Sequence, residues 1–210
     1  MSGKILAIDT TSEWGSIALV EDCLLIEEIP LHSSDGFAHV LFGEIETILA
    51  KHRLSPRDIG VFAAASGPGS FTGVRVGLTA VKGLAEAAGR KAAAVSNLQA
   101  LASFGTRPLR AAVIDARRGE IYGAVYNDAL ELADGEVVMD LDAWLATLPP
   151  GEIEFITAGV PLLGLGKAPV IKAPRALAGA VGRIAAAHLT LAKDPEAIDA
   201  NYVRRPDIRS

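Results

Sequence analysis

The sequence contains few of the residues that build covalent or metal-bound sites. Cys23 is the single cysteine among 210 residues, which excludes an intrachain disulfide framework and a cysteine-rich zinc site. No two histidines have the His-x-x-x-His spacing of a metal pair; the four are His32, His39, His52 and His188. We therefore predict that the protein has no metal site.

Long apolar runs and a signal segment are also missing. No apolar run reaches membrane-spanning length, and no basic-then-apolar segment opens the chain. The formal net charge of −5 disfavours overall attraction to nucleic acid, although a local basic patch remains compatible with it. Because half of the residues are hydrophobic and only 5% are aromatic, we expect a core of small aliphatic side chains. We expect a cytoplasmic globular protein with no membrane partner.

A glycine-rich stretch at 67–77, Gly-Pro-Gly-Ser-Phe-Thr-Gly-Val-Arg-Val-Gly, is the most distinctive local feature. It follows the apolar run 61–65 and opens a helical pattern, and Ser70 and Thr72 can each cap that helix. A glycine-rich turn into a helix N-terminus can bind phosphate, since it presents free amides. Neither the phosphate-loop pattern nor Gly-x-Gly-x-x-Gly is present, so a tight turn without a ligand is the other interpretation.

The helix predicted over 72–88 carries two neighbouring apolar faces. Positions 74, 78, 81, 85 and 88 form one face at helical spacing, which predicts packing on a sheet. The second face is made of small residues and one leucine: Gly73, Gly77, Ala80, Leu84 and Ala87. We expect it to pack on a second layer or a second chain.

The first half of the chain is repeated in the second half. At a constant offset of 106 without gaps, Asp9 falls on Asp115 and Leu24 falls on Leu130. Both halves are predicted to run strand, aspartate, polar turn, strand, tight turn, strand, and chance similarity of two hairpins is the alternative. Repetition on this scale predicts two related α/β lobes, 1–105 and 106–210, with the last helix and tail able to pack back on the first lobe.

Two lobes that each open with a strand, an aspartate turn and a strand resemble the actin, hexokinase and heat-shock-chaperone superfamily. Closer matches to the bacterial TsaB (YeaZ) family lie at 5–12, 67–77, 82–85, 114–122 and 202–204. The resemblance spans nearly the whole chain. It implies the two-lobed fold of that superfamily and a role in making threonylcarbamoyl adenosine beside the anticodon of tRNA.

The resemblance also implies partners. A TsaD-type transferase, which is a paralogue, attaches the threonylcarbamoyl group, and this chain would be its non-catalytic partner, with a TsaE-type ATPase completing the set. The tRNA would be met through the complex, and a homodimer is expected when the chain is alone. TsaD-type proteins carry a His-x-x-x-His metal pair after the glycine-loop helix. Asn97 and Leu101 stand at those positions here, so we expect no catalytic residue and no metal.

The two aspartates keep the acidic positions of the phosphate turns of the superfamily. Asp9 and Asp115 would hold magnesium and ATP, or each would satisfy nearby amides in a vestigial turn. No cofactor is our expectation. Four residues flank the second turn: Arg117, Arg118, Glu120 and Tyr122. They would contact tRNA or the partner subunit, or they would have no binding role.

We predict that the partner interface is formed by the helices at 38–52 and 72–88. The residues assigned to it are His39, Phe42, Gly73, Arg75, Gly77, Ala80, Leu84 and Ala87. A lone histidine such as His39 is more often an interface or partly buried residue than a ligand. The arginines of the tail, Arg204, Arg205 and Arg209, are typical of a solvated end.

Two other functions remain open. An ATP-dependent small-molecule kinase of the same superfamily would need a catalytic aspartate and an adenosine pocket, for which 157–159 is the only signal. A peptidase would need a zinc pair or an activated nucleophile, and the sequence offers neither.

Overall fold

The computed structural model describes residues 3–158 and 168–203. They fall into two compact units, one within Met1–Asn97 and Ala176–Asn201 and the other within Leu98–Arg175 and Tyr202–Ser210. The boundary between the two lobes that the sequence predicts lies at residue 105. The last helix belongs with the first unit, as its contacts with the first sheet show. The tail arginines lie outside the described residues, and so does Gly159 of the segment that could signal an adenosine pocket.

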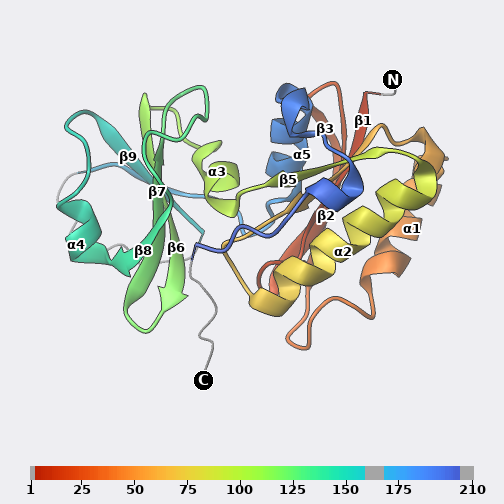
Figure 1. The fold of residues 1–210 in the computed structure, drawn as a ribbon, viewed down its shortest axis with the longest axis horizontal. Helices are drawn as coiled ribbons and strands as arrows, with labels where there is room; N and C mark the ends of the chain where they lie inside the picture. Colours follow the sequence, from red (N-terminus) through yellow and green to blue (C-terminus); the bar gives the residue numbers. More distant parts are fainter. Residues whose placement is uncertain (1–2, 159–167, 204–210) are drawn as a thin grey trace. The chain divides into compact units, whose positions relative to one another are not determined.

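The first unit is built on a five-stranded sheet with the order β3-β2-β1-β4-β5 (Figure 1). Its strands are β1 Lys4–Asp9, β2 Trp14–Glu21, β3 Leu24–His32, β4 Val61–Ala65 and β5 Lys91–Val95. The first three strands are antiparallel neighbours, and β4 and β5 continue the sheet in parallel from β1. Parallel strands end at one edge, so the residues that follow β1, β4 and β5 come together there.

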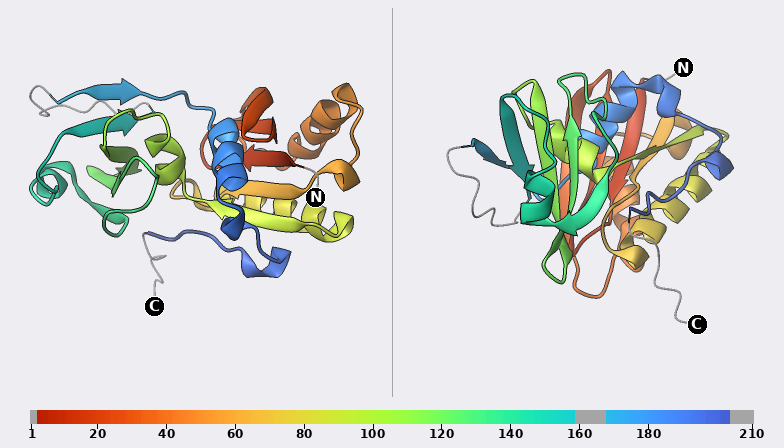
Figure 2. Two further views of the ribbon diagram at one scale, coloured as in Figure 1. Left: turned by 90° about the horizontal axis from the view of Figure 1, so that it is seen from above. Right: turned by 60° about the vertical axis from the view of Figure 1, so that its left-hand side comes forward.

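Helices cover both faces of this sheet; Figure 2 gives two further views of them. The helices α1 Leu41–Lys51 and α2 Phe71–Ala88 share a hydrophobic core with Leu6 and Ile8 of β1. Alternate residues of a strand point to opposite faces. Gly182 of α5, Ala178–Ala187, lies against Ala7 of β1, so α5 covers the other face.

The predicted core face of α2 is confirmed. Val74, Leu78, Val81 and Ala85 are buried, and Ser70 caps the helix by accepting from the amide of Gly73. The helix ends at Ala88 and is capped by Gly89, whose φ of 64° is the left-handed value that glycine tolerates best.

Two other helices are shorter than predicted. The helix predicted over 38–52 begins at Leu41, so His39 lies in the preceding turn and not on the helix. The sequence also predicts a long last helix from about 175 to 193, but α5 ends at Ala187. The chain that follows pairs with β5, since the amide and carbonyl of Lys193 both bond to Ala92.

The second unit repeats the strand order of the first. Its sheet has the order β10-β9-β6-β7-β8, with strands β6 Leu109–Arg117, β7 Glu120–Tyr126, β8 Val137–Asp140, β9 Ile153–Thr157 and β10 Val170–Lys172. Here too β6, β7 and β8 are antiparallel, and β9 and β10 are parallel to β6. The predicted duplication of the strand core is confirmed.

The gapless form of the repeat is wrong after the first strand. Ala7 pairs with Ala18, but Val113 pairs with Gly123, one residue earlier than the constant offset requires. Leu130 does not open a strand; it lies in a turn with a φ of 60°, and β8 begins at Val137. The tight turn that joins β2 to β3 is replaced here by a longer connection.

A small aromatic core stabilises the second unit. Trp144 of α4, Leu141–Leu145, is 4% exposed and meets the ring of Phe155 edge-on, with 6.4 Å between ring centroids. A Cβ atom on Gly123 would lie 2.6 Å from the Trp144 ring, so only glycine admits the indole. Among the described residues, no helix combines the length and hydropathy needed to cross a membrane.

Candidate functional site

The glycine-rich loop packs directly on the turn that follows β1. A Cβ atom on Gly69 would lie 2.5 Å from the carbonyl oxygen of Thr11, and one on Gly73 would overlap the carbonyl oxygen of Thr10. These two glycines therefore allow two backbone segments to touch. The close approach predicted for a partner at Gly73 and Gly77 is made by Thr10 of the same chain, since Gly77 also faces the Thr10 hydroxyl.

Hydrogen bonds hold the loop in this position. The Ser70 amide donates to the Thr11 carbonyl at 2.6 Å, and the Thr10 hydroxyl donates to the Gly73 carbonyl at 2.7 Å. The Ser70 hydroxyl accepts from the Gly73 amide at 3.3 Å. Because the amides of Ser70 and Gly73 already donate hydrogen bonds within the chain, the geometry favours the tight-turn interpretation over phosphate binding.

Asp9 lies beneath this turn and is 1% exposed. One of its oxygens, Oδ1, accepts from the Thr11 amide at 2.9 Å and from the Thr11 hydroxyl at 2.6 Å. Burial raises the pKa of Asp9 from 3.8 to about 6, and the bonds from Thr11 offset part of that rise. The carboxylate is thus engaged with its own turn.

Asn97 joins the glycine loop to the Asp9 turn. Its Oδ1 accepts from the Gly67 amide at 2.9 Å, and its Nδ2 donates to the Thr11 hydroxyl at 2.6 Å. The Asn97 side chain therefore has a structural task at the position where TsaD-type proteins are expected to carry a histidine. Leu101, at the second such position, is fully buried.

The hydrogen bonds that Asn97 makes were not predicted from the sequence, although the sequence contains a signal for them. Asp9 ends β1, and Ser66 and Asn97 follow β4 and β5 closely. Polar residues at the carboxyl ends of neighbouring parallel strands meet at one edge of a sheet. That rule would have predicted the network.

The second aspartate turn is open. The side chain of Asp115 is 51% exposed, and its Oδ1 accepts from the Arg117 amide at 2.7 Å. Arg117, Arg118 and Gly119 have φ values of 64°, 58° and 81°, so the hairpin tip between β6 and β7 is left-handed at three successive residues. Both arginines are exposed, whereas Glu120 and Tyr122 on β7 are half-buried.

An apolar groove of roughly 440 Å³ lies between α1 and α2. It is lined by Ala38, Leu41, Phe42, Phe71, Thr72, Arg75, Val76, Thr79 and Ala80. Phe42 is 58% exposed and Phe71 is 46% exposed, and the Arg75 guanidinium lies 3.6 Å from the Phe71 ring centroid. Exposed aromatic and arginine side chains around an apolar groove are typical of an association surface.

The predicted interface residues divide between this groove and other places. Phe42, Arg75 and Ala80 line the groove, with Ala80 buried at its floor. The others do not line it: His39 is exposed before α1, Gly73 and Gly77 face Thr10, Leu84 packs against the core, and Ala87 is exposed.

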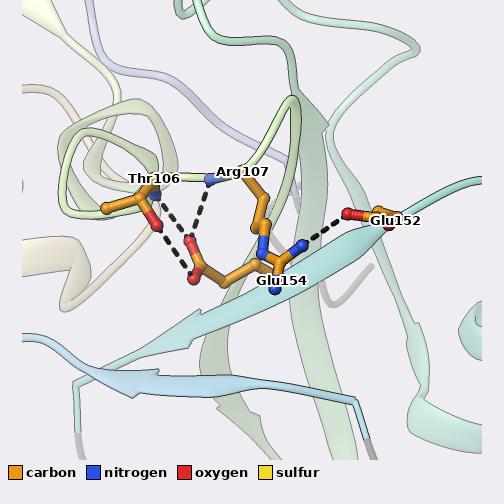
Figure 3. A network of polar contacts seen from close by, with 4 residues as sticks. All are labelled: Thr106, Arg107, Glu152 and Glu154. Carbon is orange, nitrogen blue, oxygen red and sulfur yellow. Dashed lines mark hydrogen bonds and ion pairs between the residues drawn. The ribbon is translucent and has the colours of Figure 1, made fainter.

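A buried carboxylate in the second unit was also missed (Figure 3). Glu154 on β9 is 4% exposed and accepts from the Thr106 amide at 2.7 Å and the Arg107 amide at 3.4 Å. The Arg107 guanidinium pairs with Glu152. The sequence gives little sign of this, because a glutamate inside a strand ordinarily indicates a solvent-facing position. Within 3–158 and 168–203, no three His, Cys, Asp or Glu side chains are grouped to hold a metal ion.

Comparison with known proteins agrees with this geometry. The family model TsaD, tRNA N6-adenosine threonylcarbamoyltransferase, matches residues 28–190. TsaB of Bacillus subtilis, a tRNA threonylcarbamoyladenosine biosynthesis protein, is 34% identical over 144 residues, 68% of this chain and 62% of the relative. TsaB of Escherichia coli is 39% identical over 127 residues, 59% of this chain and 54% of the relative. The matched part is thus less than two thirds of each relative.

A solved structure extends the likeness to nearly the whole chain. YeaZ from Pseudomonas aeruginosa superposes with a TM-score of 0.79 at 25% identity, covering 96% of this chain and all of that one. The two strand-aspartate-turn sheets define an α/β protein of the actin, hexokinase and heat-shock-chaperone type. Within that class, the chain belongs to the TsaD family, on the side of its TsaB (YeaZ) members.

Proposed function

We propose that this chain is the non-catalytic partner of a TsaD-type transferase that adds the threonylcarbamoyl group to adenosine beside the anticodon of tRNA. The observation that carries the proposal is the open groove between α1 and α2. Its rim is made of Phe42, Phe71 and Arg75, side chains of the kind that supply most binding energy at interfaces. A partner bound over the Phe42 and Phe71 rings would remove their exposed apolar area from water.

The hydrogen bonds of Asp9 and Asn97, at the edge of the first sheet where its parallel strands end, support a role without catalysis. Asp9 is buried and bonded to Thr11, and Asn97 is bonded to Gly67 and Thr11. An amide that is engaged on both sides has little left to offer a metal, and a catalytic metal needs several ligands and an open position. The chain would therefore act by supporting its partner.

The partner face is the surface formed by the groove residues. A paralogue of similar fold presents a related pair of helices, and a two-fold contact is self-complementary, so one face can serve a homodimer and a heterodimer. A TsaE-type ATPase and tRNA would join through the complex. Arg117 and Arg118 are the exposed cations that we assign to tRNA or partner contact, with Glu120 and Tyr122 beside them.

Reconstitution tests the proposal. A TsaD-type protein, tRNA and threonylcarbamoyl-AMP are combined with this chain, and the modified nucleoside is quantified by mass spectrometry of digested tRNA. We expect modification to depend on the chain and to fall at least tenfold with the double variant Phe42→Ala and Phe71→Ala, because a tenfold loss needs only about 1.4 kcal/mol of interface energy.

Trp14→Ala is the matched control, since Trp14 is an exposed aromatic outside the groove at 41% exposure. It is expected to leave modification unchanged. Equal modification without this chain, or full binding of the transferase by the double variant, would refute the proposal. Turnover of ATP by the purified chain alone would favour the kinase instead.

A further inference from the structure

Two neighbouring glutamates on β3 reach the ends of two helices on opposite faces of the first sheet. Alternate residues of a strand point to opposite faces, so the side chains of Glu27 and Glu28 point apart. Glu27 contacts the end of α1, and Glu28 contacts the start of α5, which covers the other face. Since β3 is an edge strand of this sheet (Figure 1), one dipeptide at the edge is bonded to both helical layers.

Glu27 holds the C-terminal end of α1 with both of its oxygens. The Lys51 ammonium donates to Oε1 at 2.6 Å, and Nε2 of His52 lies 2.7 Å from Oε2. These bonds, the one from Lys51 first, lower the pKa of the Glu27 carboxyl group from its ordinary value, so the group is charged at neutral pH. The last carbonyls of a helix carry partial negative charge and would repel a bare carboxylate. Lys51 and His52 therefore make this contact favourable.

The two contacts of Glu27 differ in their exposure to water. The Lys51 side chain is 62% exposed, so its ion pair is screened and contributes little. The side chains of His52 and Glu27 are only 26% and 20% exposed, and their bond is screened less. His52 is also the C-cap residue of α1. We therefore expect the bond from His52 to hold the end of the helix and the bond from Lys51 to add little.

Glu28 holds the N-terminal end of α5 by accepting from its amides. Its Oε1 accepts from the Gly179 amide at 2.9 Å and from the Ser16 hydroxyl at 2.8 Å. The Ser16 hydroxyl in turn accepts from the Ala178 amide at 3.0 Å. Leu177, the N-cap residue of α5, has an apolar side chain that cannot accept from these amides. Glu28 and Ser16 thus supply, from two strands, the cap that the neighbouring sequence lacks.

The contact at α1 affects the groove, because α1 forms one of its walls. Leu41 and Phe42 line the groove from the first turn of α1, and Glu27 holds the opposite end of the same helix. We propose that Glu27 and Glu28 form a two-sided clamp, in which Glu27 is the positioning residue of the groove wall and Glu28 is that of α5. Each glutamate acts on its own face of the sheet. The link from Glu27 to partner binding rests on the proposed function, whereas the clamp itself concerns the chain alone.

Amide hydrogen exchange of the full chain, followed by NMR, tests the clamp without a partner. The Leu54 amide donates to the Leu49 carbonyl at the end of α1, and Glu27→Ala should raise its exchange about fivefold, the upper end for a partly exposed ion pair. Glu28→Ala should raise exchange at Gly179 about tenfold, the factor for one lost hydrogen bond to a charged group. Each variant should leave the other amide as in the wild type. An equal rise at both amides, or no rise, would overturn the proposal.

Two further variants keep the test decisive if an alanine variant folds poorly. Glu27→Gln and Glu28→Gln keep the shape of the side chain and an oxygen acceptor but remove the charge, so each should give a smaller rise at the same amide. Glu46→Ala is the matched control, because Glu46 is an exposed glutamate on α1. Loss of its charge should leave both exchange rates unchanged.

Substitution of the two partners of Glu27 separates positioning from general stabilisation. His52→Ala should raise exchange at Leu54 as much as Glu27→Ala does, whereas Lys51→Ala should raise it less than about twofold, as expected for an exposed ion pair. His52→Gln restores a side-chain donor near the position of Nε2 and should bring the rate back toward that of the wild type. The same rise in His52→Gln as in His52→Ala would show that lost packing, and not the bond to Glu27, loosens the helix.

Affinity for a TsaD-type transferase, measured by calorimetry, tests the link from the clamp to the groove. Glu27→Ala should weaken binding about threefold, the cost of ordering a loosened side chain such as Phe42 when the partner binds. Glu28→Ala should bind as the wild type does. Equal weakening by both variants, or none by Glu27→Ala, would refute the positioning role of Glu27. A wild-type chain that does not bind the transferase would instead contradict the proposed function, and the exchange rates measured without a partner would still decide the clamp.

Discussion

The two aspartate turns share one local bond and differ in everything around it. Asp9 and Asp115 each end a strand-forming apolar run, and each accepts from the amide two residues ahead, at 2.9 and 2.7 Å. Asp9 is 1% exposed beneath the glycine loop, whereas the Asp115 side chain is 51% exposed with Arg117 beside it. A turn motif fixes the local geometry, but the segment that covers it decides what the carboxylate can do.

The largest expected effect comes from forcing the two segments of the covered turn apart. Gly73→Ala places a methyl group on the backbone carbonyl of Thr10, which cannot move without shifting β1 or α2. We expect a loss of stability of several kcal/mol, in the range of severe core strain. Thermal unfolding followed by circular dichroism measures it.

Gly119→Ala is the control from the open turn. A Cβ atom on Gly119 has no heavy atom within 4 Å, although its φ of 81° costs strain. A loss of about 1 kcal/mol is expected, the usual penalty for a non-glycine residue at positive φ. Equal losses in the two variants would show that the glycine loop is not held against the Asp9 turn.

The next effect concerns the buried charge of Asp9. Its pKa rises from 3.8 to about 6 on folding, so between these values the folded state binds more protons than the unfolded state. Stability therefore falls as pH rises through this window, and above it the full penalty remains. Asp9→Asn keeps an oxygen for Thr11 and removes the charge. We expect it to stabilise the protein at pH 7 by roughly 2–3 kcal/mol, the free energy of a shift of this size.

Chemical denaturation at pH 4 and pH 7 measures the effect of Asp9→Asn. The variant should lose the part of the fall in stability between those pH values that Asp9 contributes, and the wild type should keep it. A variant less stable than the wild type at pH 7 would mean that the carboxylate has a partner that the asparagine cannot satisfy.

The smallest expected effect is on nucleotide binding. Because the Asp9 turn is closed by Thr11 and Asn97, Asp9→Ala should leave the affinity of the isolated chain for magnesium ATP unchanged. Isothermal calorimetry checks this. Micromolar binding that Asp9→Ala abolishes would reopen a nucleotide role for the first turn, and binding lost only in Asp115→Ala would move that role to the second.

Local pattern predicted much of the fold. Helical spacing identified the core face of α2 at Val74, Leu78 and Val81, and the aspartate and hairpin pattern identified the duplicated strand core. It did not identify which neighbour meets the small face of α2. Gly73 meets Thr10, 63 residues earlier in the chain, and spacing within a helix carries no information about so distant a partner.

The candidate site was harder to predict because its bonds are non-local. Asn97 bonds to Thr11 across 86 residues, and Glu154 bonds to the Thr106 amide across 48. Phe42, Arg75 and Ala80, which the sequence assigned to a partner interface, line the groove, and the binding of a partner there stays a prediction. Phe71 and Thr79 were missed because they belong to neither of the two faces read from the sequence.

The packing of Trp144 against Gly123 and Phe155 gives the protein a built-in optical reporter. The chain has only two tryptophans, and one belongs to each unit. Trp144 is enclosed at 4% exposure, and Trp14 is 41% exposed at the start of β2. The red shift of fluorescence on unfolding will come chiefly from Trp144 and will follow the second unit, while quenching by dissolved iodide will report chiefly on Trp14. The unfolding of the second unit can therefore be followed without any label.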